Sequence, residues 1–103
     1  MAYNLTLGTA ALAEIQNASD WYANVSQPTF EKFLDAIDDR LLDLSERPES
    51  FTLVRLNPNF RRVKLRRFPY LLIFRVNPAI KRVFIAAFIH EKRNPTDWAR
   101  KLR

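Results

Sequence analysis

Residues 82–90 read Arg-Val-Phe-Ile-Ala-Ala-Phe-Ile-His, and the uninterrupted apolar run from Val83 to Ile89 decides the fold. The run is far too short to span a bilayer. It also lacks the alternation of polar and apolar residues that is typical of a strand with one solvated face. A strand that is apolar at every position is covered on both faces. The sequence therefore predicts an interior strand over residues 82–89.

Two shorter strands are expected before this run, over residues 62–66 and 70–76. They are separated from each other and from the last strand by short links that contain Pro69 and Pro78. Short links between strands favour an antiparallel meander. Basic side chains alternate with apolar ones along residues 62–66, which is typical of a charged edge strand.

The first half of the chain predicts a strand followed by two helices. Apolar and polar residues alternate over Ala2 to Leu7, which indicates a strand with one buried face. A helix is expected from Thr9 to about Asn24, and a second one from Pro28 to just before Pro48. The apolar stripe of the second helix is formed by Phe30, Phe33, Leu34, Ile37, Leu41 and Leu44.

These elements predict an α+β fold with the order β-α-α-β-β-β. The helical hairpin packs on one face of a four-stranded, mainly antiparallel sheet, and the first strand lies beside the last, giving the strand order 1-4-3-2. Residues 48–60 have no clear period, and we expect part of them, residues 52–56, to be extended. The C-terminal segment with Trp98 is expected to cover part of the other face. We expect Trp21 and Trp98 to be core or lid residues rather than platforms for stacking.

Length and composition indicate one packed globular domain over residues 1–103. The chain is 48% hydrophobic and 27% charged, which argues against disorder. It has no cysteine, which excludes disulfides, a thiolate nucleophile and cysteine-based metal sites and favours a cytoplasmic protein. Neither a signal peptide nor a membrane span is expected.

The charges are distributed unevenly along the chain. Residues 1–54 carry three Lys and Arg against nine acids, whereas residues 55–103 carry fourteen against two. The basic half suits phosphates or an acidic protein partner, although a solubilising surface is an equally simple interpretation. In the acidic half, Glu31, Asp35, Asp39 and Asp43 recur at four-residue spacing, which predicts a solvated helix face or an interaction surface.

Two motifs together give the chain a resemblance to a known family. Residues 61–65 read Arg-Arg-Val-Lys-Leu and lead into Arg-Phe-Pro-Tyr at residues 67–70. Residues 90–95 read His-Glu-Lys-Arg-Asn-Pro and are followed by Trp98. After a strand and a helical hairpin, this order resembles the RelE/ParE superfamily of bacterial type II toxins. Both motifs are more similar to the ParE-like plasmid-stabilisation members than to the mRNA-cleaving RelE branch.

The resemblance implies a growth-inhibiting toxin that is neutralised by a cognate antitoxin, of the ParD type or a related one, in a toxin–antitoxin hetero-oligomer. ParE-like members act on DNA gyrase, and RelE-like members cleave mRNA in the ribosomal A site. We expect a gyrase inhibitor that is not an enzyme, with a ribosome-dependent, metal-independent endoribonuclease as the alternative. No cofactor, metal ion or membrane is expected as a partner.

Metal-free RNA cleavage requires a base for the 2′-hydroxyl proton, a cation for the phosphorane and an acid for the 5′-oxygen. If the chain is a ribonuclease, His90, Arg62 and Lys64 are its candidate catalytic residues. The mRNA-cleaving members that the chain resembles typically carry an arginine right after the position of Tyr70, where this sequence has Leu71. Three roles stay open for His90, namely a structural residue at the strand end, a partner contact and a catalytic group.

The candidate partner contacts are basic residues that precede and follow the last two strands in the sequence. A charged edge strand can accept an extended acidic antitoxin segment as an added strand. Binding of single-stranded nucleic acid by charge and stacking, and simple protection of the edge by charge, are the other interpretations. The candidate residues are Arg62, Lys64, Arg66, Arg67, Lys92 and Arg93.

Overall fold

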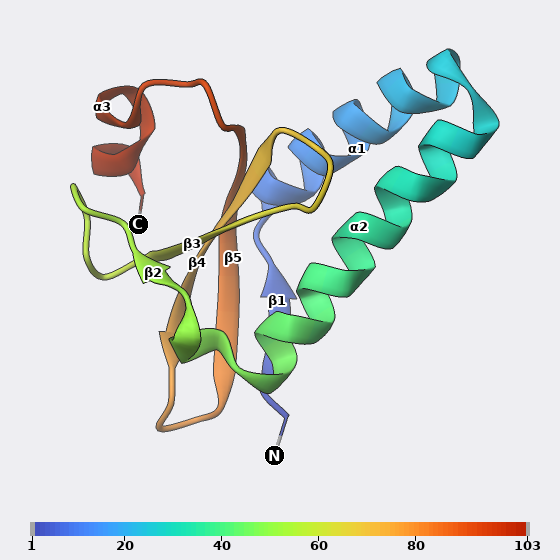
Figure 1. The fold of residues 1–103 in the computed structure, drawn as a ribbon. Coiled ribbons are helices and arrows are strands. Elements are labelled where there is room, and N and C mark those ends of the chain that lie inside the picture. The colour runs from blue at the N-terminus through green and yellow to red at the C-terminus, as the bar shows by residue number, and fades with distance from the viewer. Residues whose placement is uncertain (1, 103) are drawn as a thin grey trace.

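The computed structural model describes residues 2–102 and contains a five-stranded sheet with a helical hairpin on one face (Figure 1). The sheet has the order β1-β5-β4-β3-β2. The α+β class and the interior position of the last strand are confirmed. In chain order the elements are β1 (Asn4–Leu7), α1 (Thr9–Val25), α2 (Gln27–Glu46), a 3-10 turn η1 (Pro48–Ser50), β2 (Thr52–Leu53), β3 (Arg61–Lys64), β4 (Tyr70–Asn77), β5 (Arg82–His90), α3 (Pro95–Trp98) and a 3-10 turn η2 (Ala99–Lys101).

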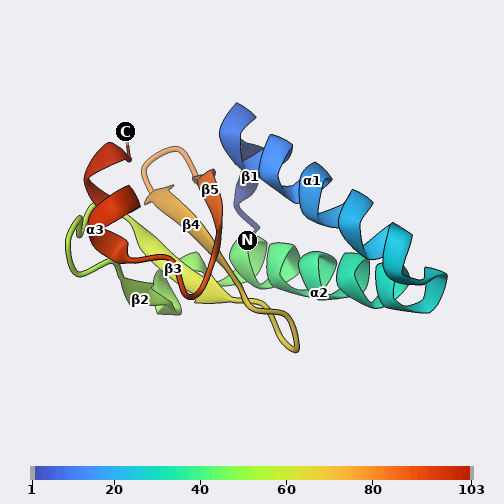
Figure 2. The ribbon, with the colours of Figure 1, turned by 90° about the horizontal axis from the view of Figure 1, so that it is seen from above.

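The hairpin of α1 and α2 turns at Ser26. The Ser26 hydroxyl accepts a hydrogen bond from the Thr29 backbone N–H at 3.1 Å and so caps the N-terminus of α2. Pro28 lies in the first turn, where its missing N–H costs no helical hydrogen bond. The closed end of the hairpin extends beyond the sheet, as the view from above shows (Figure 2).

β5 lies between β1 and β4, as its apolar sequence predicts. It pairs in parallel with β1, from Asn4 with Arg82 to Leu7 with Ile85. It pairs antiparallel with β4 along the full length of that strand, with a register shift between Ile73 and Phe74. β5 therefore has a neighbouring strand along both of its edges, and the side chains of Val83, Ile85, Phe88 and Ile89 are buried.

The sheet has one strand more than the four that we expected from the sequence. Residues 52–53 form the short strand β2, which pairs antiparallel with Arg62 and Arg61 of β3. The basic strand β3 is consequently covered at its N-terminal end, and the strand at that edge of the sheet is β2. A two-residue strand carries no periodicity, so the pattern of residues 52–56 indicates extension but not pairing.

Two apolar clusters occupy the two faces of the sheet. The larger one lies between the sheet and the helical hairpin and includes the fully buried Phe33, Leu44, Leu72 and Phe74. The smaller one lies under the C-terminal segment, where Trp98 packs with the side chains of β4 and β5. The predicted cover by the C-terminal segment is thus confirmed.

Trp21 does not lie in the core as predicted. It is 62% exposed near the closed end of the hairpin, where its ring makes an edge contact with Tyr22 at 5.0 Å between centroids. The helical stripe that we used places Tyr22 inward, and a neighbouring position on a helix points about 100° away. Within residues 2–102, no helix combines the length and the apolar character that crossing a membrane requires.

Candidate functional site

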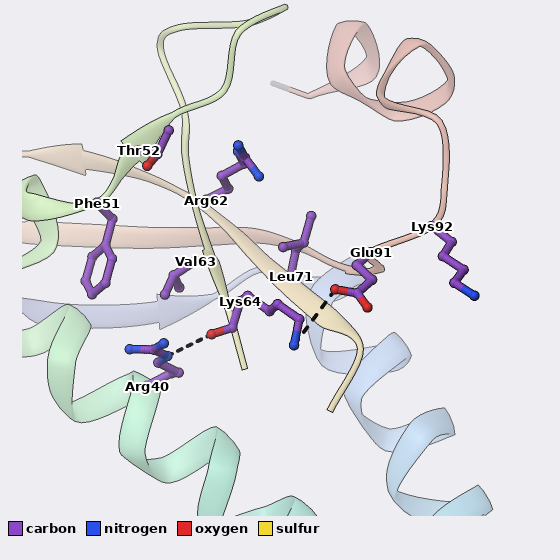
Figure 3. A pocket seen from close by; sticks show the side chains of 9 residues that line it. All are labelled: Arg40, Phe51, Thr52, Arg62, Val63, Lys64, Leu71, Glu91 and Lys92. Carbon is purple, nitrogen blue, oxygen red and sulfur yellow. Dashed lines mark hydrogen bonds and ion pairs between the residues drawn. The ribbon is translucent and has the colours of Figure 1, made fainter. Parts of the chain in front are cut away.

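A cavity of about 540 Å³ opens along the edge of the sheet at β3, and we call it the basic groove (Figure 3). Val63 points toward the helical hairpin and packs in the larger core cluster, so its neighbours Arg62 and Lys64 point to the opposite face. Leu71 of β4 faces the same cavity. The lining residues are Arg40, Phe51, Thr52, Arg62, Val63, Lys64, Leu71, Glu91 and Lys92.

A second cavity of about 470 Å³ adjoins the basic groove, and we call it the Trp98 cavity. The two cavities share Arg62, Leu71 and Glu91 in their linings. Residues of the segment from Arg93 to Trp98 also line the Trp98 cavity. The two cavities thus share the apolar side chain of Leu71, and each has cations in its lining.

Lys64 is held in place by a set of polar contacts. Its Nζ atom donates to the backbone carbonyls of Leu65 and Phe68, each at 3.3 Å, and lies 3.8 Å from Oε2 of Glu91. The Lys64 carbonyl accepts a hydrogen bond of 2.8 Å from Nε of Arg40 on α2 (Figure 3). The end of β3 is therefore fixed both to the helical hairpin and to the β3–β4 turn.

Asp43 organises the cations at the boundary between α2 and the sheet. It accepts from Arg40 at 3.0 Å and from Arg47 at 3.1 Å, and it lies 3.8 Å from Arg66. Burial alone would raise the pKa of the Asp43 carboxyl, but the hydrogen bonds from Arg40 and Arg47 outweigh it and hold the pKa below its usual value. The solvated face predicted for the acidic ladder thus ends before Asp43, which is only 15% exposed.

The structure brings together some of the six candidate partner contacts and separates the others. Arg62, Lys64 and Lys92 line the basic groove, and Arg62 and Arg93 line the Trp98 cavity. Arg66 and Arg67 lie at the β3–β4 turn, where they line a different cavity against acidic residues of α2. The positive φ of 72° at Arg67 belongs to this turn.

His90 lies on the other face of the sheet from the basic groove. Its ring meets the edge of Tyr70 at 5.5 Å between centroids, and Tyr70 stacks on Phe88 in the cluster beneath the helical hairpin. The Nδ1 atom of His90 accepts a hydrogen bond of 3.1 Å from the backbone N–H of Lys92. The structure therefore does not gather His90 with Arg62 and Lys64 into one set.

Sequence reasoning missed three contributors to this site. Arg40 contributes from α2, Glu91 opposes the cations, and Trp98 forms a wall of the second cavity rather than only a part of the core. A signal for Arg40 was available, because it is the single basic residue among the acids of residues 33–46. Nothing in the local pattern places it next to β3, since that contact depends on tertiary packing.

The arrangement suits the binding of an anionic or acidic surface. Four cations surround an apolar floor, and the one carboxylate among them, Glu91, already lies near Lys64. Opposite charges across an interface steer association and fix its orientation. At the centre of the floor lies Leu71, which is 8% exposed and provides no charge or hydrogen bond from its side chain.

Comparisons with known proteins identify related chains. The family model described as the ParE toxin of the type II toxin–antitoxin system, parDE, matches residues 5–95. The chain is similar to a structure of the chromosomal ParDE toxin–antitoxin system from P. aeruginosa, with 21% identity, a TM-score of 0.71, and coverage of 85% of this chain and 95% of that one. No curated protein matches the chain.

Two toxin–antitoxin complexes of the RelBE type show the same fold. For the intact E. coli RelBE complex the identity is 23%, the TM-score 0.62, and the coverage 89% of this chain and 100% of that one. For the RelBE2 complex from Mycobacterium tuberculosis the identity is 20%, the TM-score 0.62, and the coverage 87% and 99%.

Proposed function

Because the chain belongs to the ParE toxin family, and is thereby the toxin component of a type II toxin–antitoxin system, we propose that a cognate antitoxin holds it inactive and that the free toxin inhibits DNA gyrase. The proposal treats the chain as a binding protein rather than an enzyme. We further propose that the antitoxin binds the basic groove.

The separation of His90 from the groove cations is the observation that carries the gyrase proposal. A ribonuclease needs its proton-transfer group and its cation within hydrogen-bond reach of the same phosphate. Here Arg62 and Lys64 face the groove, whereas His90 packs on Tyr70 beneath the helices. Leu71 lines the groove. At this position the mRNA-cleaving members of the superfamily typically carry an arginine. These two features favour inhibition by binding.

The charge of the groove supports an acidic segment of the antitoxin as its ligand. An extended segment can lie across Arg62, Lys64 and Lys92 while its side chains enter the cavities. Exposed charge pairs contribute mainly to the association rate and orientation, whereas buried parts of the interface contribute most of the affinity. We therefore expect the apolar floor and the cations to act together.

An experiment in cells tests the target. The chain is induced without its antitoxin, and DNA synthesis and protein synthesis are followed by pulse labelling. We expect an early arrest of DNA synthesis with DNA-damage signalling, while translation continues. Co-expression of the antitoxin encoded beside the toxin gene should restore growth. An early arrest of translation instead would contradict the gyrase proposal.

A variant experiment tests the location of the antitoxin surface. Reversal of Arg62 to Glu, combined with Lys64→Glu, should weaken the toxin–antitoxin complex by more than tenfold at low salt, because two attractive charges become repulsive. Arg100→Glu is the matched control, since Arg100 is exposed and lines neither cavity. An unchanged affinity in the double variant would place the antitoxin elsewhere.

The second candidate function is ribosome-dependent cleavage of mRNA. It is favoured by the presence of Arg62 and Lys64 in one groove, as expected for cations that contact a phosphate chain. Programmed ribosomes incubated with the purified toxin separate the two functions. We expect no A-site cleavage by primer extension; cleavage that His90→Ala abolishes would make the enzyme the correct function.

A further inference from the structure

The sheet face opposite the helical hairpin, which we call the outer face, is covered by the C-terminal segment at one end. Trp98 and Ala99 pack over the end where β5 finishes, whereas the β4–β5 turn lies at the far end (Figure 1). Leu5, Val76 and Val83 pack beneath the hairpin, so the residues next to them on each strand point to the outer face. At the far end these residues are exposed, apart from a half-buried Phe84, and we call them the outer-face platform: Asn4, Thr6, Arg75, Asn77, Arg82 and Phe84.

The platform residues form two rows that cross three strands. In the first row Arg75 of β4 pairs with Phe84 of β5, and Phe84 pairs with Thr6 of β1. The second row consists of Asn77, Arg82 and Asn4. Arg75 and Arg82 are therefore diagonal neighbours on adjacent strands, a position in which Cα atoms lie about 7–8 Å apart. The two cations can contact neighbouring groups of a single ligand.

Arg75 packs against aromatic rings. Its guanidinium carbon lies 5.0 Å from the ring centroid of Phe84 and 5.9 Å from that of Phe60. A guanidinium over an aromatic ring is stabilised by the ring electrons, and its N–H groups stay able to donate to an anion. The plane of a guanidinium also accepts a stacked nucleobase. Arg75 can thus serve as a phosphate contact and as a stacking surface.

The platform lies in a part of the chain that has no acidic residue. Residues 50–90 contain nine Lys and Arg and no Asp or Glu. Within residues 2–102, neither Arg75 nor Arg82 forms an ion pair. A cavity of about 390 Å³ opens beside them, with the 59% exposed Ile80 as part of its apolar wall. Its lining residues are Arg75, Val76, Asn77, Pro78, Ile80, Arg82 and Phe84.

Single-stranded nucleic acid offers a match for each of these features. Its phosphates pair with arginine, and its bases stack on flat side chains. The side chains of Asn4, Thr6 and Asn77 each donate and accept hydrogen bonds, as base edges do, whereas the carboxylates of an acidic peptide only accept. A duplex fits less well, because its major groove admits a helix or a two-stranded ribbon and not the face of three strands.

We propose that the outer-face platform binds a short single strand of nucleic acid, with phosphates on Arg75 and Arg82 and one base stacked on the Arg75 guanidinium. The platform is separate from the basic groove. Asn77 comes six residues after Leu71 in the same strand, which corresponds to about 20 Å at 3.3 Å per residue. The inference is therefore independent of the antitoxin surface and of the groove in which mRNA cleavage would take place.

The first experiment measures the affinity of the toxin for fluorescein-labelled hexathymidylate by anisotropy at several salt concentrations. Arg75→Gln combined with Arg82→Gln should weaken binding more than about tenfold at low salt. It should also make the slope of log K against log salt shallower by about 1.4, since each phosphate contact on a single strand contributes about 0.7. Arg100→Gln combined with Lys101→Gln is the matched control, because it removes the same charge at exposed positions of η2.

A second variant tests the stacked base. Arg75→Lys keeps the charge and removes the flat guanidinium, so it should weaken binding of hexathymidylate about fivefold or more without changing the salt slope. Arg82→Lys is the control, since Arg82 is assigned a phosphate contact alone, and its affinity should stay within about twofold of the wild type.

NMR of the unchanged toxin tests the location without any variant. In ¹⁵N spectra, hexathymidylate should shift the side-chain amide signals of Asn4 and Asn77. The signal of Asn24 should stay in place, because Asn24 is exposed near the closed end of the hairpin. Hexauridylate should cause the same shifts, since the assigned contacts involve bases and phosphates and not the 2′-hydroxyl.

Several results would overturn the inference. Equal weakening by the Arg100 and Lys101 control would reduce the binding to net charge, and unmoved amide signals of Asn4 and Asn77 would place the strand elsewhere. Displacement of hexathymidylate by an equal concentration of hexaglutamate would assign the platform to an acidic protein. Tighter binding of a six-base-pair duplex, or binding of only one of the two oligonucleotides, would contradict the assigned contacts.

Discussion

Replacing Asp43 with Asn tests how the helical hairpin is tied to the basic groove. Asp43 accepts from Arg40 and Arg47, and Arg40 in turn donates to the carbonyl of Lys64. The side chains of Asp43 and Arg40 are only 15% and 16% exposed, so their ion pair is better protected from water than a surface pair. The substitution keeps the size of the side chain and removes its charge.

The expected loss follows from the geometry of these pairs. A hydrogen bond between charged partners contributes about 1.5–3 kcal/mol, and an exposed ion pair contributes less than about 1 kcal/mol. Arg47 is 59% exposed, so most of the effect comes from Arg40. We therefore expect Asp43→Asn to lower the free energy of unfolding by about 2 kcal/mol at pH 7, which lowers the midpoint of urea unfolding by about 1 M.

The effect should depend on pH with a definite sign. The pKa of Asp43 is lowered in the folded state from its ordinary value of 3.8. A lowered pKa stabilises the fold fully above the unfolded pKa, and that stabilisation is lost as the pH falls through the folded pKa. The difference between the wild type and Asp43→Asn should therefore be constant from pH 5 to 8 and shrink below about pH 4.

Urea unfolding followed by circular dichroism at several pH values measures this difference. Asp38→Asn is the matched control, because it is the same chemical change at an exposed position of the same helix. We expect the control to stay within about 0.5 kcal/mol of the wild type. A difference for Asp43→Asn that stays the same from pH 7 to pH 3 would refute the role assigned to the Asp43 charge.

Three further predictions concern the core and the sheet. Phe33→Ala should lower the free energy of unfolding by about 3–5 kcal/mol in urea titrations, because Phe33 is fully buried, whereas Leu42→Ala at a 59% exposed position should have little effect. Gly8→Ala should lower the free energy of unfolding by about 1–3 kcal/mol in the same assay, because the added Cβ would lie 2.8 Å from the ring of Phe84. An unchanged free energy of unfolding would show that the ring moves aside freely. Burial, and then the neighbouring Tyr70, raise the pKa of Tyr22 from 10.0 to about 12. The contribution of Tyr22 to the free energy of unfolding is therefore complete below pH 10 and is lost as the pH rises toward 12. Urea unfolding at pH 8 and pH 11 should show this loss in the wild type relative to Tyr22→Phe, and equal pH dependence of the two proteins would contradict it.

Most of the fold follows from the sequence because its signals are strong and local. The apolar run Val83–Ile89 determines β5, and the helical stripe around Phe33 together with Pro28 determines α2. The order of strands follows from the burial of that run. The strand β2 could not be predicted, because its two residues gain their structure from pairing with β3.

The site is less accessible to sequence reasoning than the fold. Alternation along β3 places Arg62 and Lys64 on one face, as expected for a strand. The position of His90 depends instead on the face that β5 presents after its unpaired residue Ala86, where the register with β4 shifts, and no local pattern reveals this shift. The approach of Arg40 to β3 depends on contacts between segments far apart in the sequence.

The parallel pairing of β1 with β5 determines when a newly synthesised chain becomes harmful. β1 leaves the ribosome first, but its partner strand is made almost last, since Asn4 pairs with Arg82. Pairings between distant segments form late and slowly. A chain whose translation stops before β5 therefore leaves the first strand unpaired and the middle of the sheet open. Incomplete translation products of this toxin should be unfolded and harmless, and an antitoxin needs to meet only chains whose synthesis is nearly finished.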